Sequence, residues 1–376
     1  MSIELISFLF VAVFVVILLT GLPLAFATGA VAVFFAVLLF GWPGLTLIVG
    51  RVFTLMGNYV LVSVPLFIFM ARGYKKELAL GCICAGGGLA TLIPPSVVFI
   101  MYGLTAGVSI GQLYMAGVIP GLMLAAMYIA YIIVRCRQRP DFAPPAGEAE
   151  LAIPLRAKVA LLRELILPGL VAFSVLGSLY LGWATPTEAA GVGVLGAVVA
   201  MWWNGKFGWD KLRSAAEDTA KVTVMLYWLF FGSSALIGVY TLAGGTKLIQ
   251  DALTALPVGP LGVVILIQIV WIILGCFIDW IGILLLTAPI FVPVVLALGF
   301  DPVWMGVLFC MNMQISYISP PFGPAAFYLK GVTPAGITLG DIFGSIWPYM
   351  GLQVIALGLV VAFPQIALWL PNTMMK

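Results

Sequence analysis

The hydrophobic and polar positions of this chain form long apolar runs separated by short polar connections. Most runs are long enough to cross a hydrocarbon core of about 30 Å as helices of about 20 residues. They predict spans at residues 5–20, 24–41, 59–70, 78–107, 112–134, 165–182, 186–203, 222–241, 260–299 (a double run), 302–330 and 342–370. We therefore expect an all-α polytopic membrane protein.

Two of these runs repeat each other, and each is broken by a pair of prolines. Pro94-Pro95 interrupts the fourth run and Pro320-Pro321 the tenth, at an offset of 226 residues. After a three-residue slip, the Gly-X-Ser/Thr-X-Gly segments at 107–111 and 336–340 also align. Paired, interrupted hydrophobic segments in the two halves of a chain indicate the substrate or ion site of a secondary transporter.

Composition excludes several other classes of protein. The chain is 63% hydrophobic and only 8% charged, whereas soluble domains carry about 25% charged residues. Histidine is absent, which excludes histidine-based catalysis and histidine-ligated metals. The five cysteines form no CxxC pair, so neither a disulfide framework nor a thiolate metal site is indicated. Glu4 replaces the basic start of a signal peptide, so we expect the first run to be retained.

Lysine and arginine predict the orientation of the spans. Alternate threading places 14 of the 17 basic residues on one side, including those of the loop from Arg135 to Arg163 and of a predicted amphipathic helix at 206–221. By the positive-inside rule this side is cytoplasmic and both termini are periplasmic. The two broken runs then enter the membrane from opposite sides, as in inverted-topology repeats.

The Pro-Pro breaks are the candidate site. Each proline removes a backbone donor and forces the helix to open. The free carbonyls of a half-helix suit a hard cation such as Na⁺, and the N-terminus of the next half-helix suits an anion. A pair of kinked helices that bind nothing is the alternative. Candidate ion or substrate residues at the breaks are Leu92, Pro94, Pro95, Ser96, Ile318, Ser319, Pro320, Pro321 and Gly323, with Ala90 and Ser316 beside them.

Asp279 is the one acid flanked on both sides by long apolar runs. It is either a cation contact at a hairpin tip or only the N-cap of a half-helix that starts near Ile281. Thr287, Pro289 and Pro293 are expected to break this segment further, which favours a re-entrant hairpin. Glu188 is expected in the first turn of a capped helix.

These patterns predict five segments. They are N-terminal scaffold spans (1–70), a first repeat with the Pro94-Pro95 break (71–134), a cytoplasmic loop (135–164), scaffold spans with the amphipathic arm (165–258), and a second repeat with the Asp279 hairpin and the Pro320-Pro321 break (259–376).

Residues 71–80, 85–96 and 109–121 resemble the large membrane subunit, a DctM-type permease, of TRAP (tripartite ATP-independent periplasmic) transporters. Segments 286–293, 299–302 and 319–323 of the second half agree with the same family. The resemblance implies an elevator-type carrier of the ion-transporter superfamily in the bacterial inner membrane, driven by Na⁺, that imports organic acids. It implies two partners, a small four-helix membrane subunit and a periplasmic substrate-binding protein, and no enzymatic activity.

The resemblance also implies a set of Na⁺ ligands. Backbone carbonyls near Ala90, Leu92 and Pro95 correspond to the first Na⁺ site, and those near Ser316, Ile318 and Pro321 correspond to the second. Ala90 and Ser316 stand where family members commonly have glycine, and backbone ligation there requires an allowed φ/ψ.

The chain departs from the family near Met70 and Ala71. Relatives carry several tens of residues there, including a hairpin that completes the first Na⁺ site. Either the protein has lost this segment or the sequence omits it; a real loss is expected to abolish that site and to impair transport. The alternative functions are a passive channel, since broken helices also line pores, or another carrier of the superfamily that needs no binding protein. An intramembrane enzyme would need a second acid or a base near Asp279.

Overall fold

The computed structural model describes residues 73–144, 166–203, 207–217, 257–321, 323–334 and 336–374, with Pro154, Gly205, residues 219–220 and Asp251 between them. All regular elements of these residues are helical. The spans predicted at 5–20, 24–41, 59–70 and 222–241 lie outside the described residues, as does the Met70/Ala71 junction.

The described helices agree with the predicted runs. The first group is α5 (Lys76–Leu89), α6 (Val97–Ala106), α7 (Ile110–Gln138) with the short η1 (Pro140–Phe142), α10 (Ile166–Tyr180) and α11 (Pro186–Trp203). The second group is α14 (Gly259–Gly275), α15 (Trp280–Ala297), α16 (Pro302–Ile318), α17 (Pro324–Val332), α18 (Leu339–Ala362) and α19 (Gln365–Met374).

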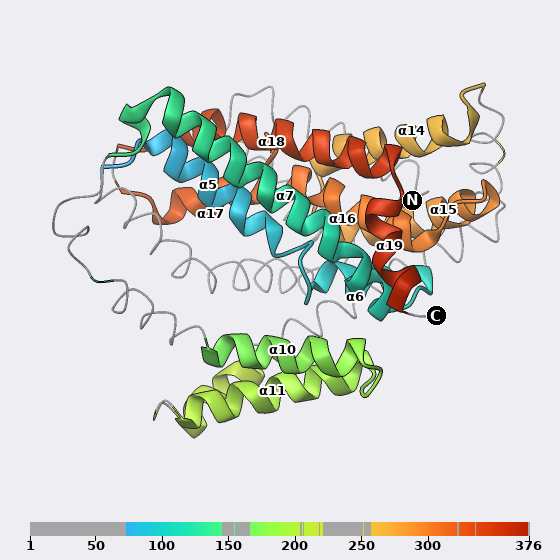
Figure 1. Cartoon of the computed structure of the whole chain (residues 1–376), viewed down its shortest axis with the longest axis horizontal. Helices are drawn as coiled ribbons and strands as arrows, with labels where there is room; N and C mark the ends of the chain where they lie inside the picture. The colour runs from blue at the N-terminus through green and yellow to red at the C-terminus, as the bar shows by residue number, and fades with distance from the viewer. Residues whose placement is uncertain are drawn as a thin grey trace, which may run out of the picture.

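Helix α16 is the centre of the bundle (Figure 1). Fifteen of its seventeen residues are buried, and helices from both halves of the sequence contact it. Phe309 on α16 stacks on Tyr102 of α6 and meets the Trp271 ring of α14 edge-on, with ring centroids 5.9 and 4.9 Å apart. These large buried rings hold both α6 and α14 against α16.

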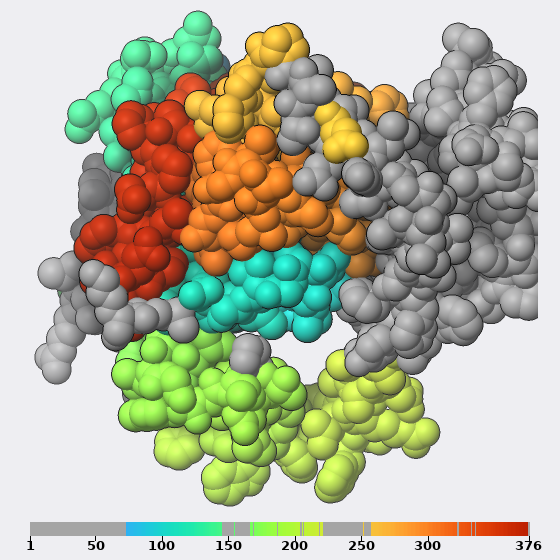
Figure 2. Space-filling model, turned by 90° about the vertical axis from the view of Figure 1, so that its right-hand side faces the viewer, coloured from blue at the N-terminus to red at the C-terminus, as the bar shows by residue number. Residues whose placement is uncertain are grey.

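Helices α10 and α11 form a separate antiparallel pair beneath the main bundle (Figures 1 and 2). Thr185 and Glu188 form a capping box at the start of α11, because the Glu188 carboxylate accepts from the Thr185 N–H at 2.7 Å and Thr185 Oγ1 accepts from the Glu188 N–H at 3.4 Å. The capping prediction for Glu188 is therefore confirmed. The pair exposes Phe173, Trp183 and Trp202, as expected of a surface that faces lipid or another subunit.

Two sequence predictions are wrong. Pro289 and Pro293 do not break their segment, because α15 continues through both. Neither is followed by a second proline, and the neighbouring Ala288, Val292 and Val294 are buried, so packing holds the helix together. The run 342–370 is not one helix: α18 ends at Ala362, before Pro364, and α19 begins at Gln365.

Three described helices are long and apolar enough to cross a membrane: α7, α15 and α18. The helices α6 and α14 and the apolar parts of α10 and α11 are shorter but similarly apolar. The polar stretch after α11 is helical over its described residues 209–217, with Phe207 and Trp209 exposed and in edge-to-face contact. These features fit the predicted amphipathic helix.

Candidate functional site

The first break lies between α5 and α6 and leaves backbone oxygens without their helical donors. In a helix, the carbonyls of Ala90 and Thr91 would accept from the residues at 94 and 95, but both are prolines and have no N–H. Thr91 O is satisfied by Ser96 Oγ and by Cys310 Sγ of α16. No hydrogen bond within the described residues reaches the oxygens of Ala90 and Leu92.

Two glycines of α7 hold the first break in place. A Cβ on Gly117 would lie 2.7 Å from the Leu92 oxygen and 2.5 Å from the Phe99 ring, and a Cβ on Gly121 would lie 2.7 Å from Ile93. Residues 117 and 121 are one helical turn apart and form a groove for the chain at Leu92-Ile93. Ser96 then caps α6 by accepting from the Phe99 N–H.

The second break, between α16 and α17, has the same form. In a helix, the carbonyls of Ser316 and Tyr317 would accept from the residues at 320 and 321, which are prolines and have no N–H. These two carbonyls lie 226 residues after those of Ala90 and Thr91 in the first break. Ser319 Oγ donates to the Ser316 oxygen at 3.3 Å. Gly323 is the N-cap of α17, and a Cβ there would lie 3.0 Å from the Ile318 oxygen, so the chain turns back closely on itself.

The tip of the α14–α15 hairpin packs on this second break. A Cβ on Gly275 would lie only 1.8 Å from Ser316 Oγ, and Cys276 Sγ lies 3.9 Å from Ser319 Oγ. Asp279 is the N-cap of α15, which begins at Trp280, and its carboxylate accepts from the Ile281 N–H at 3.4 Å. The capping role considered for Asp279 is confirmed, and α15 begins one residue before the expected start near Ile281.

The first break has no equivalent cover among the described residues. Gly86, Gly87 and Ala90 of the first break are exposed. Their counterparts 226 residues later, Asn312, Met313 and Ser316, are buried. Since α14 and α15 both pack against α16, the difference follows from the hairpin at the second break.

The two breaks are linked through the bundle interior. Gln314 Nε2 donates to the Gly88 oxygen at 2.9 Å, and these two residues are themselves 226 positions apart. Gly88 lies two residues before Ala90, and Gln314 lies two residues before Ser316; the carbonyls of Ala90 and Ser316 are the first in each break to lose their helical donor. This contact was not predicted, because neither residue belongs to a Pro-Pro motif; only the repeat offset pairs them.

Thr287 lies within α15 and faces α14. Its Oγ1 accepts from Trp271 Nε1 at 2.8 Å and donates to the Ile283 oxygen at 2.7 Å. The hydroxyl is thus used by the hairpin itself.

We expect Thr287→Val to destabilise the protein by about 1–3 kcal/mol, because it leaves the buried Trp271 N–H without an acceptor. Thr287→Ser keeps the hydroxyl and should retain most of the stability. Thermal melting of both variants in NaCl and in KCl measures the effect. A loss of the Na⁺ response in Thr287→Val without a loss of stability would instead make Thr287 an ion ligand.

The two ends of the bundle differ in chemistry. At the end where α5 and α18 begin (Figure 1), Lys76 pairs with Asp341 at 2.7 Å, and Lys330 donates to the Ile337 oxygen at 2.6 Å. Lys75 pairs with Asp141, and this hydrogen bond lowers the pKa of the Asp141 carboxyl below its usual value. Lys75, Lys76 and Lys330, three of the basic residues predicted to share one side, therefore lie at one end of the bundle.

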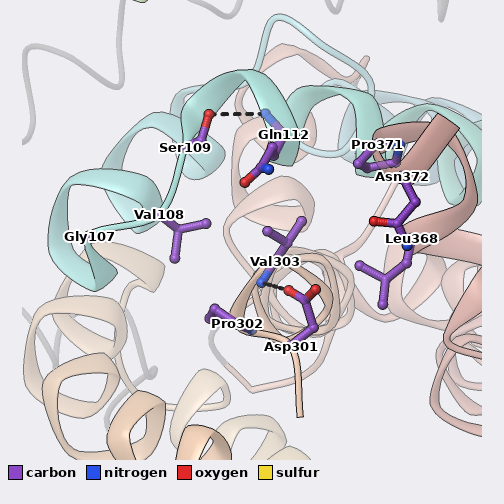
Figure 3. Close-up of a pocket in the computed structure, with 10 residues that line it drawn as sticks. All are labelled: Gly107, Val108, Ser109, Gln112, Asp301, Pro302, Val303, Leu368, Pro371 and Asn372. Carbon is purple, nitrogen blue, oxygen red and sulfur yellow. Dashed lines mark hydrogen bonds between the residues drawn. The ribbon is translucent and has the colours of Figure 1, made fainter. Parts of the chain in front are cut away.

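The opposite end carries a pocket of about 320 Å³. Gln112 of α7, Asn372 of α19 and Asp301, the N-cap of α16, face it from separate walls (Figure 3). By the repeat, Gln112 and Pro302 are the counterparts of Asp341 and Lys76. The ion pair of one end thus corresponds to an open pocket with a mixed polar and apolar lining at the other.

No group of three or more acidic, cysteine or histidine side chains that could hold a metal occurs in the described residues. The donors that the breaks offer are neutral backbone oxygens and hydroxyls, such as those of Ala90, Ser316 and Ser319. Such a set suits a hard monovalent cation better than a transition metal.

Broken helices around a buried central helix, with several further apolar helices, define a multi-pass α-helical membrane protein with the architecture of a membrane transporter. Residues 71–366 match the family model described as "Tripartite ATP-independent periplasmic transporter, DctM component". The chain belongs to this family of large permeases, which confirms the resemblance and places it in the bacterial inner membrane. The match begins at Ala71, next to the expected junction.

Three relatives show the range of the family. The chain is 31% identical to the C4-dicarboxylate TRAP transporter large permease protein DctM of Pseudomonas aeruginosa, over 82% of this chain and 71% of the relative. It is 30% identical to the ectoine permease TeaC of Halomonas elongata, over 83% and 71% of the two chains. It is also 30% identical to the sialic acid permease SiaM of Vibrio cholerae, over 80% and 68%. These relatives are transport permeases rather than enzymes.

Proposed function

We propose that the chain is the permease subunit of a Na⁺-coupled TRAP transporter that imports organic acids. Its partners in this proposal are a small four-helix membrane subunit and a periplasmic substrate-binding protein. Family membership supports the transporter class, and the names of two relatives, which specify a dicarboxylate and sialic acid, support an acidic substrate.

The observation that carries Na⁺ coupling is the contact between the hairpin tip and the second break. It brings Gly275 and Cys276 against Ser316 and Ser319, where the Pro-Pro pair has removed two helical N–H donors. Opened backbone inside a membrane costs several kcal/mol per unsatisfied group unless a partner satisfies it. A Na⁺ ion held by carbonyls near Ser316, Ile318 and Pro321 is such a partner.

The arrangement of the halves supports an inverted-topology, elevator-type carrier. Helix α6 follows α5 at one end of the bundle, whereas α17 follows α16 at the other (Figure 1). The Gly88–Gln314 contact between equivalent positions is what a two-fold axis between α5 and α16 would produce. Alternating access in folds with inverted repeats is a rigid-body movement of one part of the protein against the other.

The first Na⁺ site, near Ala90, Leu92 and Pro95, lacks its hairpin in this proposal. The exposed Gly86, Gly87 and Ala90 are the face on which a segment inserted between Met70 and Ala71 would pack.

Two measurements test the proposal. NaCl should raise the melting temperature of the purified chain relative to KCl, because a ligand that binds only the folded state stabilises it. In proteoliposomes with both partners, radiolabelled succinate should enter only with an inward Na⁺ gradient and the binding protein. Uptake should be stronger when the corresponding segment of the Pseudomonas relative is restored after Met70. Uptake that needs neither gradient nor binding protein would favour the channel alternative.

A further inference from the structure

A line of buried polar side chains leaves the first break and runs between α7 and α18. We call Gln314, Gln353, Tyr128, Tyr349 and Arg135 the polar seam. The first four are nearly fully buried, with exposed fractions of 0, 1, 5 and 1% for Gln314, Gln353, Tyr128 and Tyr349. Arg135 is partly exposed at the cation-rich end of the bundle.

Contacts place these side chains in sequence. Gln314 bonds to Gly88 at the first break, and a Cβ on Gly88 would lie 3.9 Å from Gln353 Nε2. The Tyr128 hydroxyl lies beside the Gln353 side-chain amide.

The line continues along α7. The Tyr349 ring meets the rings of Tyr128 and Tyr131 edge-on, with centroids 5.4 and 5.2 Å away. Arg135 follows Tyr131 by one turn, and its guanidinium lies over the Phe142 ring, 5.1 Å from the ring centroid. The seam therefore reaches from the interior to the end of α7.

The seam gathers most of the unpaired polar atoms of the described protein. In the described residues, eight buried side-chain nitrogen or oxygen atoms have no hydrogen-bond partner. Six of the eight belong to the seam: Gln314 Oε1, Gln353 Oε1 and Nε2, Tyr128 Oη, Tyr349 Oη and Arg135 Nε. An unsatisfied buried polar atom costs about 1–3 kcal/mol, and an isolated one is rare in native proteins. Six in one line require a partner that the described residues do not supply.

We propose that the polar seam holds ordered water and forms an aqueous route for a small hydrated cation between the first break and the Arg135 end of the bundle. Amide and hydroxyl groups both donate and accept, so water can satisfy every atom of the seam. The seam contains no carboxylate, so no opposite fixed charge within it holds a cation in place. Its use by the coupling ion rests on the proposed function, whereas its hydration does not.

Thiol accessibility tests the hydration. In the full chain with its five native cysteines replaced, Gln353→Cys is compared with Ala356→Cys, a fully buried apolar position of the same helix. A membrane-impermeant, cationic methanethiosulfonate is the probe, because it reacts with the thiolate that forms only in a wet site. We expect the Gln353→Cys variant to react at least about ten-fold faster, since each pKa unit changes the thiolate fraction about ten-fold.

The side of access tests the direction. The reagent should label Gln353→Cys in vesicles that expose the Arg135 end and not in vesicles of the opposite orientation. Equal rates for the two variants, or access from the other side alone, would overturn the proposal. Labelling needs neither Na⁺ nor transport, so an absence of Na⁺-driven uptake would sink the proposed function and leave the seam intact.

Discussion

Replacing Gly275 with alanine is expected to separate the α14–α15 hairpin from the second break and to abolish stabilisation by Na⁺. The new Cβ would lie 1.8 Å from Ser316 Oγ, 2.4 Å from Ser316 Cβ and 3.4 Å from its Cα. Rotation of the serine side chain cannot relieve the contact with Cβ, so the helices must move apart. Overpacking of this kind costs about 1–3 kcal/mol, and here the displaced groups border the proposed ion site.

Melting temperatures in NaCl and KCl measure both effects. Gly275→Ala should melt lower than the unmodified protein in KCl and should gain nothing from NaCl. Gly344→Ala is the matched control, because a Cβ on this α18 glycine meets no atom within 4 Å. The double variant Gly275→Ala/Ser316→Gly removes the clashing atoms and should regain stability. A Gly275→Ala protein that still responds to NaCl would exclude the hairpin tip from the ion site.

The helices were largely predictable, because in this chain almost every apolar run is a helix. The run at 186–203 agrees with α11 at both ends. The Pro-Pro breaks were also predictable. Two adjacent prolines remove two successive N–H donors, and the first proline, because it precedes another proline, is disfavoured in the helical conformation. Pro289 and Pro293 were misjudged because whether a single proline opens a helix depends on packing around it, which the sequence does not display.

The contacts that assemble the site were not predictable. Nothing in the sequence pairs Gly275 with Ser316, because a glycine can occur in an apolar run for many structural reasons. Gln314 lies in a helix that is buried on all sides, and its bond to Gly88 depends on how α5 crosses α16. The repeat offset was the one signal that could have suggested this pair.

The first break can be disturbed without touching the second. Gly117→Ala is expected to lower the melting temperature, because its Cβ would lie 2.7 Å from the Leu92 backbone oxygen and 2.5 Å from the buried Phe99 ring. A backbone oxygen cannot rotate away, so the chain at Leu92 must leave its groove on α7. The expected cost is again about 1–3 kcal/mol.

The response to Na⁺ separates this variant from Gly275→Ala. In this chain the proposed ion site with its hairpin in place is the second one, so Gly117→Ala should melt lower and still gain stability from NaCl. Gly111→Ala on the same helix is the control, because its Cβ would meet only side-chain atoms, Leu179 Cδ2 at 3.3 Å and Ser109 Oγ at 3.7 Å. Equal melting temperatures of Gly117→Ala and Gly111→Ala would contradict the inference that the chain at Leu92 lies in a groove at Gly117. Loss of the Na⁺ response in Gly117→Ala would show that the breaks act as one unit through Gly88 and Gln314.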